Sequence, residues 1–121
     1  MKYLLIAGLL YLIVLQTGCY YNKEELLNPG NICDTTNITY RFSVNPILTI
    51  NCTGCHSGPN APNGVRLETY EGVKIQASNG FLLGVITHSA GFPPMPKNGG
   101  KLSDCNIDKI RKWIDAGFPN N

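Results

Sequence analysis

The sequence predicts an all-α domain of about four short helices joined by long loops. Two observations carry this prediction: helix-capping residues stand before several apolar stretches, and apolar residues in those stretches recur at helical spacing. Alternation of apolar and polar residues, which is typical of strands, is scarce. At 121 residues the chain has room for one domain. Four short helices form a thin core at this length, so we expect something besides side chains to fill the middle.

The N-terminal segment predicts export. The stretch Tyr3–Leu15 is uncharged and almost wholly apolar, and Met1 and Lys2 precede it. It is shorter than the ~20 residues that span a bilayer as a helix, but it matches the apolar core of a secretory signal. A buried core helix is disfavoured because the stretch has no polar face. We therefore expect residues 1–18 to be a signal peptide.

Cys19 predicts a lipid anchor. The small residue Gly18 before it resembles the lipobox of bacterial lipoproteins, in which the cysteine is acylated and becomes the mature N-terminus. Gln16 stands where that pattern usually has leucine, and plain cleavage or an uncleaved anchor are the alternatives. Acylated Cys19 would hold the protein on a membrane, facing the periplasm or the cell surface. Residues 19–32 would form a polar tether to a globular domain at 33–121.

The charge pattern gives no support to a nucleic-acid partner. The formal net charge is only +2, and the sequence has no basic stripe interleaved with aromatic residues. The basic cluster at 109–112 is typical of a solvated helix face. We therefore expect a membrane anchor but no nucleic acid.

The first helix of the globular part is expected to begin at Asn45. Asparagine is a good N-cap, and Pro46 would then occupy the first helical position. The apolar stripe Ile47–Ile50 follows and leads into Cys52. This helix therefore delivers a cysteine at its C-terminal end.

Two further segments have helical features. Residues 69–77 form a candidate helix in which Val73 and Ala77 share a face, although Gly72 weakens the pattern. The apolar stretch 81–87 fits a short helix or a buried strand, and periodicity does not decide between them.

The last predicted helix has the clearest signals. Ser103 is a good N-cap, and Ile107, Ile110 and Ile114 line one face. Gly117 supplies the left-handed residue that commonly ends a helix. We expect this helix to form part of the core.

The segment Cys52–His56 reads Cys-Thr-Gly-Cys-His, the attachment pattern of haem c. Two cysteines one helical turn apart present their sulfurs to the two haem vinyl groups, and thioether bonds result. The imidazole of His56 then lies beneath the iron as its proximal ligand. We expect one covalent haem here.

Three other interpretations of this segment are weaker. A thioredoxin-like redox pair needs a βαβ setting, which the sequence does not predict. A zinc site would need to recruit Cys33, His88 or Cys105, whose spacing forms no second Cys-x-x-Cys pair. A disulfide between Cys52 and Cys55 has poor geometry at helical spacing.

Met95 is the expected sixth ligand of the iron. Proline flanks it on both sides in the loop Gly91–Lys97, which stiffens the loop and can hold the thioether in place. His88 is the alternative ligand, and a bis-histidine haem would have a lower reduction potential.

The ordered set Cys52–His56, Pro94–Pro96 and the helical ending Ile110–Gly117 resembles single-domain class I-type bacterial cytochromes c, in particular small lipoprotein cytochromes of the cell envelope. The resemblance covers residues 33–121. It implies a cytochrome c-like fold around one haem, with the apolar faces of residues 47–50 and 107–114 in contact.

Cys33 and Cys105 depart from the basic pattern of that family. With Cys19 assigned to lipid and two cysteines to haem, these two are left in an oxidising compartment. We expect them to form a disulfide, and two separate buried thiols are the alternative.

The resemblance implies a carrier of single electrons between redox proteins, with no small-molecule substrate and no enzymatic activity of its own. The alternatives are a haem subunit of a larger redox complex and a gas- or peroxide-reactive haem protein with an open sixth site. Lys97 and Lys101 flank the Met95 loop and are candidates for steering an acidic partner. The expected aromatic lining of the haem site is Tyr70, Phe81, Phe92 and Trp113.

Overall fold

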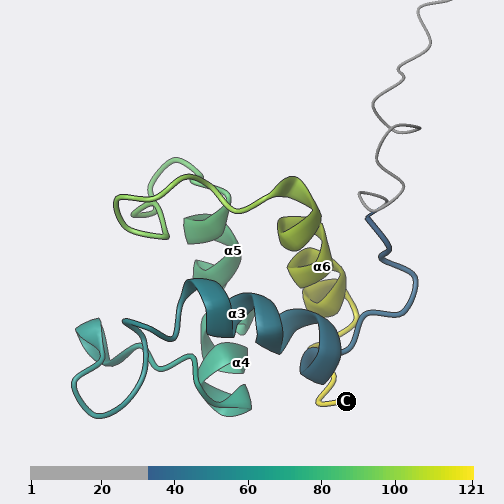
Figure 1. Cartoon of the computed structure of the whole chain (residues 1–121), viewed down its shortest axis with the longest axis horizontal. Helices are drawn as coiled ribbons and strands as arrows, with labels where there is room; N and C mark the ends of the chain where they lie inside the picture. The colour runs from purple at the N-terminus through teal and green to yellow at the C-terminus, as the bar shows by residue number, and fades with distance from the viewer. Residues whose placement is uncertain (1–32) are drawn as a thin grey trace, which may run out of the picture. The chain divides into compact units, whose positions relative to one another are not determined.

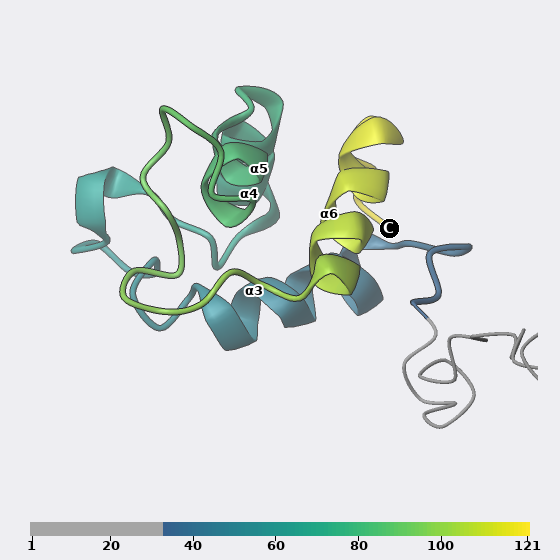
Figure 2. The ribbon, with the colours of Figure 1, turned by 90° about the horizontal axis from the view of Figure 1, so that it is seen from above.

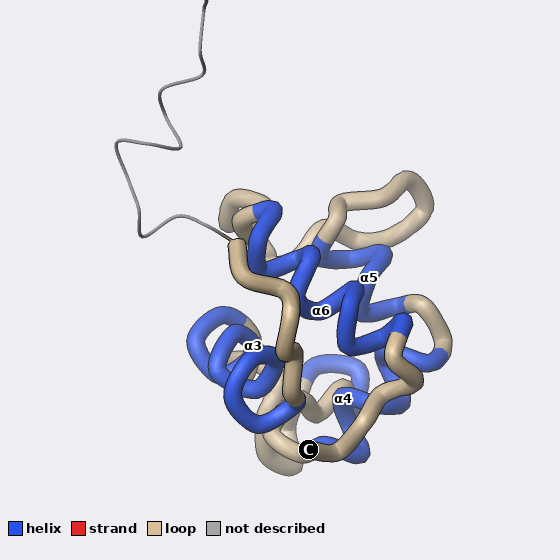
Figure 3. The backbone as a smooth tube through the Cα atoms, turned by 90° about the vertical axis from the view of Figure 1, so that its right-hand side faces the viewer, coloured by secondary structure: helices blue, strands red, loops and turns tan. Residues whose placement is uncertain are grey.

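The structure is a computed structural model, and residues 33–121 of it are described here. Within this range the chain is helical and forms no strand, so the all-α prediction is confirmed (Figures 1 and 3). The elements are the π-helical turn η1 (Tyr40–Val44), α3 (Asn45–Asn51), the 3₁₀ turn η2 (Pro62–Gly64), α4 (Tyr70–Ser78), α5 (Phe81–Ile86) and α6 (Asp104–Asp115).

The predicted signal peptide (residues 1–18), the lipidation site Cys19 and the tether (residues 19–32) lie outside the described residues. Among residues 33–121, no helix has the length and apolar character needed to cross a membrane.

The first helix begins earlier than predicted. Thr39 is its N-cap, and the hydroxyl oxygen of Thr39 accepts a hydrogen bond from the backbone N–H of Phe42 at 3.1 Å. Asn45 has helical dihedral angles, and its N–H donates to the carbonyl of Tyr40, so the prediction that Asn45 caps the helix was wrong. The wide π-turn suits Pro46, which has no N–H and whose ring would collide with a carbonyl in a regular α-helix.

Helix α4 matches its prediction within one residue. The Thr69 hydroxyl oxygen accepts a hydrogen bond from the N–H of Gly72 at 3.2 Å, and Val73 and Ala77 are buried. Gly72 is required by a close approach, because a Cβ there would lie 2.0 Å from the carbonyl oxygen of Arg66. The glycine that weakened the helical pattern therefore lets the incoming chain pack against α4.

The apolar stretch that periodicity left undecided forms helix α5. Glycine again marks a close contact, because a Cβ on Gly84 would lie 2.6 Å from the ring of Phe92. The Phe92 ring also packs edge-on against Phe81, with ring centroids 5.3 Å apart. These contacts hold the loop at 91–97, which we call the Met95 loop, against α5.

Helix α6 has the predicted boundaries. The hydroxyl oxygen of Ser103 accepts from the N–H of Asn106 at 3.3 Å, and Gly117 ends the helix with a φ of 82°. The buried face differs in one position from the prediction. Trp113 is buried together with Ile107 and Ile110, whereas Ile114 is only partly buried.

The start of the domain packs against its end. Helix α6 packs chiefly against η1 rather than against α3, so the predicted contact of residues 47–50 with α6 is displaced toward the N-terminus (Figure 2). Ile47 is buried as expected, but Ile50 is 81% exposed. Tyr40, at the start of η1, makes the contact instead, and its ring centroid lies 5.5 Å from that of Trp113.

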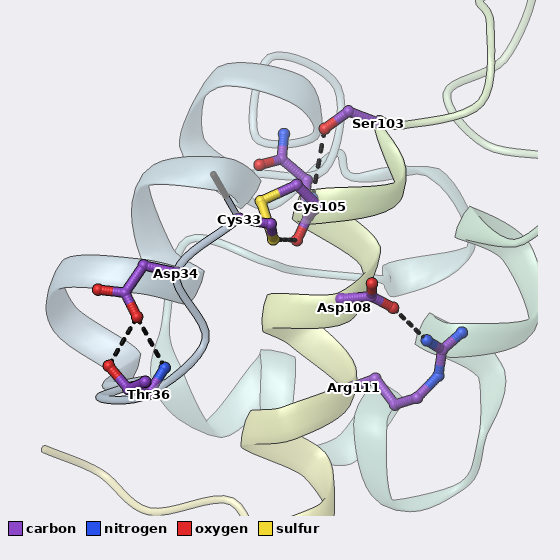
Figure 4. Close-up of a disulfide and its surroundings, with 8 residues drawn as sticks. Cys33, Asp34, Thr36, Ser103, Cys105, Asp108 and Arg111 are labelled. Carbon is purple, nitrogen blue, oxygen red and sulfur yellow. Dashed lines mark hydrogen bonds and ion pairs between the residues drawn. A yellow bond between two sulfur atoms is a disulfide. The ribbon is translucent and has the colours of Figure 1, made fainter. Parts of the chain in front are cut away.

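A disulfide between Cys33 and Cys105 ties the first described residue to the first turn of α6 (Figure 4). The two Cα atoms are 5.4 Å apart and the cysteines are 72 positions apart in the chain. In the chain-entropy model, closing a loop of this length stabilises the folded state by about 4 kcal/mol. The neighbouring turn is held by Asp34, whose carboxylate accepts two hydrogen bonds from Thr36, and these bonds lower the pKa of Asp34.

Candidate haem-binding site

A cavity of about 430 Å³ gathers the residues of the sequence motif and of the Met95 loop. Its walls include Cys52, Cys55 and His56 of the motif. They also include Met95, which lies about forty residues further along the chain. The rest of the lining is mainly apolar, and its volume falls in the range of small-molecule and cofactor sites. The principal apolar lining residues are Ile50, Val65, Leu67, Phe81, Leu82, Val85 and Ile86.

A hydrogen-bonded turn at the end of α3 brings the motif to this cavity. The N–H of Cys52 still donates to the carbonyl of Leu48, at 2.8 Å, so Cys52 is positioned by the helix. The carbonyl of Cys52 then accepts from the N–H groups of Cys55, at 3.1 Å, and of His56, at 2.9 Å. Both cysteines and the histidine are therefore held by one short turn rather than by a continuous helix.

The ring of His56 is oriented by the backbone. Its Nδ1 lies 3.2 Å from the carbonyl oxygen of Val65. A carbonyl can only accept, so Nδ1 carries the proton and the lone pair of the neutral ring is on Nε2. A second hydrogen bond fixes the main chain, because the N–H of Leu67 donates to the His56 carbonyl at 2.8 Å. This arrangement leaves Nε2 of His56 available as a metal ligand.

The two motif cysteines are free thiols in the structure, with no disulfide between them. Cys55 is exposed, whereas Cys52 is partly buried and its burial raises the pKa of its thiol to about 11. The Cys52 thiol is therefore protonated at neutral pH, although the thiolate is the nucleophile of dithiol redox enzymes and the usual ligand of zinc. A protonated Cys52 thiol therefore favours neither a redox-active dithiol nor a zinc site.

Met95 is anchored at the cavity by its main chain. Its N–H donates to the carbonyl of Val85 at 3.0 Å, and its side chain packs against the core. Pro93 and Pro96 also line the cavity, so the prolines that suggested a stiff loop lie at the site. His88, the alternative ligand, is exposed and is not part of the lining. Its Nε2 instead lies 3.1 Å from the carbonyl oxygen of Met95.

The expected aromatic lining was only partly right. Phe81 lines the cavity, and the ring of Phe92 packs edge-on against that of Phe81 without lining the cavity itself. Tyr70 and Trp113 are not among the lining residues, because they pack with Tyr40 in the core next to α6. The spacing of these aromatic residues in the sequence does not show whether they line the cavity or pack in the core.

The two lysines near the Met95 loop have different surroundings. Lys97 lines the cavity. Lys101 forms an ion pair with Asp104 at 2.9 Å, in the first turn of α6. Only Lys97 therefore lies at the site itself.

The metal-binding side chains at the cavity are too few for a bare metal ion, but they suit a metal that a cofactor already holds. In residues 33–121, no three side chains of histidine, cysteine, aspartate or glutamate cluster closely enough to hold a bare metal ion. The disulfide also occupies Cys33 and Cys105, which a zinc site would have to recruit. The cavity instead offers one imidazole, from His56, and one thioether, from Met95, and these two side chains could hold the iron of a haem.

The surface of the cavity fits a large apolar group. Ile50 is 81% exposed and Phe81 is 44% exposed, and both are cavity residues. Exposed apolar surface of this kind at a cavity is typical of a ligand-binding site. A porphyrin between these side chains would cover the surface, with the two cysteine sulfurs within the same lining for covalent attachment.

Sequence reasoning missed the role of Val65. Its carbonyl orients the His56 ring, but a backbone carbonyl carries no signal in the amino-acid sequence. The exposed position of Ile50 was also missed, because its helical spacing predicted burial.

No protein-family model, curated protein or solved structure matches the chain.

Proposed function

We propose that the protein is a mono-haem c-type cytochrome that carries single electrons between redox proteins of the cell envelope. Haem would be attached through Cys52 and Cys55, with His56 and Met95 as axial ligands of the iron. The observation that carries the proposal is an apolar cavity whose lining includes all four of these residues. The proposal includes a cytochrome c-like arrangement of the helices.

Haem would supply a one-electron couple, because its iron can be ferric or ferrous. Every other part of the function falls to the chain. His56 and Met95 would leave no free coordination position, so the iron could change charge without binding a substrate. The thioether of Met95 would favour the ferrous state and raise the reduction potential. The apolar walls would exclude water and keep the change in solvation small.

The proposal extends to export and anchoring. Residues 1–18 would direct secretion, and lipid on Cys19 would hold the domain on a membrane surface. Attachment at a membrane would keep a small carrier close to partner redox proteins, which raises its effective concentration there. The mass of the detergent-extracted mature protein tests this part, because acylation would add the mass of the lipid to an N-terminus at Cys19.

The function is tested by producing the full chain in a host that attaches haem c. We expect the protein to carry the mass of one haem through denaturation and to show Soret absorption that changes on reduction. Replacing Cys52 and Cys55 by alanine is the matched control and should abolish the added mass. A wild-type protein with only the mass of its amino acids and no Soret band would refute the proposal.

Met95→Ala tests the sixth ligand. The variant should keep covalent haem, lower the reduction potential and bind carbon monoxide readily in the ferrous state, because a coordination position becomes free. The wild type should bind carbon monoxide poorly. Ready binding by the wild type would instead support a gas- or peroxide-reactive haem protein.

A further inference from the structure

His88 occupies an unusual position between α5 and the Met95 loop. Its side chain is exposed, yet its backbone has a φ of 54°, in the left-handed region. Few residues with a side chain adopt this conformation, because the Cβ approaches the following carbonyl, although histidine does so more often than most, as do asparagine and aspartate. Such a conformation persists where surrounding contacts compensate for it, and the contacts of His88 are therefore informative.

The side chain of His88 forms a hydrogen bond with the main chain of Met95. Nε2 of His88 lies 3.1 Å from the carbonyl oxygen of Met95. The carbonyl can only accept, so Nε2 carries the proton and donates. An Nε2 atom used in this way has no lone pair for a metal. This bond therefore distinguishes His88 from His56, whose Nδ1 is the donor.

Two hydrogen bonds hold the backbone of Met95 in place. Its N–H donates to the carbonyl of Val85 near the end of α5, at 3.0 Å, and its carbonyl accepts from His88 at 3.1 Å. The backbone of His88 is tied to the same helix, because its N–H donates to the Val85 carbonyl at 3.4 Å. Both polar groups of the Met95 backbone are thus anchored to α5 or to the residues that directly follow it.

We propose that His88 is a positioning residue that holds Met95 at the cavity and thereby controls how often the sixth coordination position opens. This inference rests on the proposed function, because it concerns the bond between the Met95 thioether and the haem iron. Proline on both sides limits the conformations of the Met95 loop, and the His88 hydrogen bond selects among those that are left. Loss of this bond would raise the population in which the thioether is away from the iron.

The test compares two amide replacements in the haem-loaded full chain. In His88→Gln the side-chain amide lies close to the position of Nε2 and can still donate to the Met95 carbonyl. In His88→Asn the amide is too short to reach, but asparagine tolerates a positive φ, so the backbone is not strained further. His88→Gly also removes the bond and favours the same φ, which provides a second variant if His88→Asn folds poorly.

The readout is the affinity of the ferrous protein for carbon monoxide, measured per covalently bound haem, together with the reduction potential. We expect His88→Asn and His88→Gly to bind carbon monoxide roughly two- to tenfold more tightly than the wild type, which corresponds to the loss of one ordinary hydrogen bond. We expect His88→Gln to restore wild-type affinity. A role in folding alone would change the yield or stability without changing affinity per haem.

Three results would overturn the inference: the first two leave the proposed function standing, and the third replaces its sixth ligand. The first is wild-type affinity in His88→Asn and His88→Gly while Met95→Ala opens the site. The second is an equal increase in His88→Gln and His88→Asn, which would exclude the hydrogen bond as the cause. The third is a fully open site in His88→Asn with no effect of Met95→Ala, which would make His88 the ligand. Absence of covalent haem from the wild type would refute the proposed function itself.

Discussion

In the α6 half of the domain, which comprises η1, α6 and residues 116–121, Trp113 is fully buried and packs against Tyr40. In the cavity half, which comprises residues 50–67 and 81–97, Ile50 is 81% exposed and lines an open cavity. Burial of apolar surface is the main stabilising contribution to folding, and it scales with the area removed from water. The packing around Trp113 thus stabilises the α6 half, whereas Ile50 in the cavity half gives no such stabilisation without a ligand.

This difference assigns different roles to the two halves. The α6 half is closed by the chain itself, through aromatic packing, the disulfide and hydrogen bonds that the backbone N–H groups of Tyr40 and Arg41 donate to oxygens of Asn121. The cavity half holds the residues proposed to bind haem, and the exposed apolar surface of Ile50 and Phe81 would be covered when haem is present. Changes to the α6 half should thus alter stability, whereas changes to the cavity half should alter cofactor binding and local order.

The largest expected effect follows from replacing both Cys52 and Cys55 by alanine. Covalent haem should be lost completely, and the cavity half should become less protected because its centre lacks the group that completes its core. Hydrogen exchange of the Met95 and Leu67 amides, which donate to Val85 and His56, should accelerate by roughly tenfold or more relative to the haem-loaded wild type.

The amides at the end of α6 are the control for this comparison. Those of Ala116 and Gly117 donate to carbonyls of α6, and their exchange should change less than that of Met95. Equal acceleration in both halves would show that the α6 half also depends on haem. Unchanged exchange in both would show that the cavity half needs no cofactor for its order.

Trp113→Ala should have the largest effect on stability in the α6 half. Removing a fully buried tryptophan leaves a cavity and is expected to lower the free energy of unfolding by about 3–5 kcal/mol. The covalent haem content should not change, because Trp113 is not among the cavity residues. Denaturant unfolding of the haem-loaded protein measures the loss. Ile75→Ala is the control, since Ile75 is 59% exposed and its replacement should alter stability by no more than about 0.5 kcal/mol.

Removing the disulfide should cost about 2–4 kcal/mol of unfolding free energy. The double variant Cys33→Ser, Cys105→Ser removes the link between the start of the domain and α6. Neither cysteine lines the cavity, so haem content should again be unchanged. Chemical reduction of the wild type should lower its stability by a similar amount and leave the double variant unaffected. A wild type whose unfolding midpoint does not respond to reduction would contradict this prediction.

Local signals explain which elements the sequence could predict. The boundaries of α6 depend on Ser103 and Gly117, which act on their immediate neighbours through a hydrogen bond and a positive φ. Thr69 acts in the same way at the start of α4. The pair Asn45–Pro46 gave an equally good local signal and was misleading. Thr39 caps the helix instead, and burial of Tyr40 beside α6 extends it by contacts that are distant in sequence.

The candidate site was predictable in its side chains but not in its supports. Cys52–His56 is a contiguous motif, and proline marks the Met95 loop on both sides. The Val65 carbonyl that orients His56, and the hydrogen bond of His88 to Met95, arise only when the chain is folded. Sequence reasoning accordingly treated His88 as a rival ligand, because a histidine near a methionine gives no indication of which atom faces the cavity.

The smallest expected effect concerns two tyrosines of similar surroundings. The hydroxyl of Tyr40 is buried and has no hydrogen-bond partner among residues 33–121, whereas the hydroxyl of Tyr70 donates to the carbonyl of Phe118 at 2.6 Å. A buried polar group without a partner is unfavourable, and one with a partner contributes modestly. Tyr40→Phe should therefore leave stability unchanged or raise it by up to about 1 kcal/mol, and Tyr70→Phe should lower it by about 1 kcal/mol.

The dependence of stability on pH separates the role of Tyr40 from a general packing effect. Burial, and to a lesser extent the nearby Tyr70, raise the pKa of Tyr40 above its ordinary value of 10.0. Above pH 10 the unfolded chain releases this proton while the folded protein retains it, so the unfolding free energy falls as the pH rises. Tyr40→Phe should reduce that alkaline slope in denaturant unfolding measured between neutral and alkaline pH. An unchanged slope would mean that the Tyr40 hydroxyl reaches water in solution, and the α6 half would then be less tightly closed than the packing around Trp113 indicates.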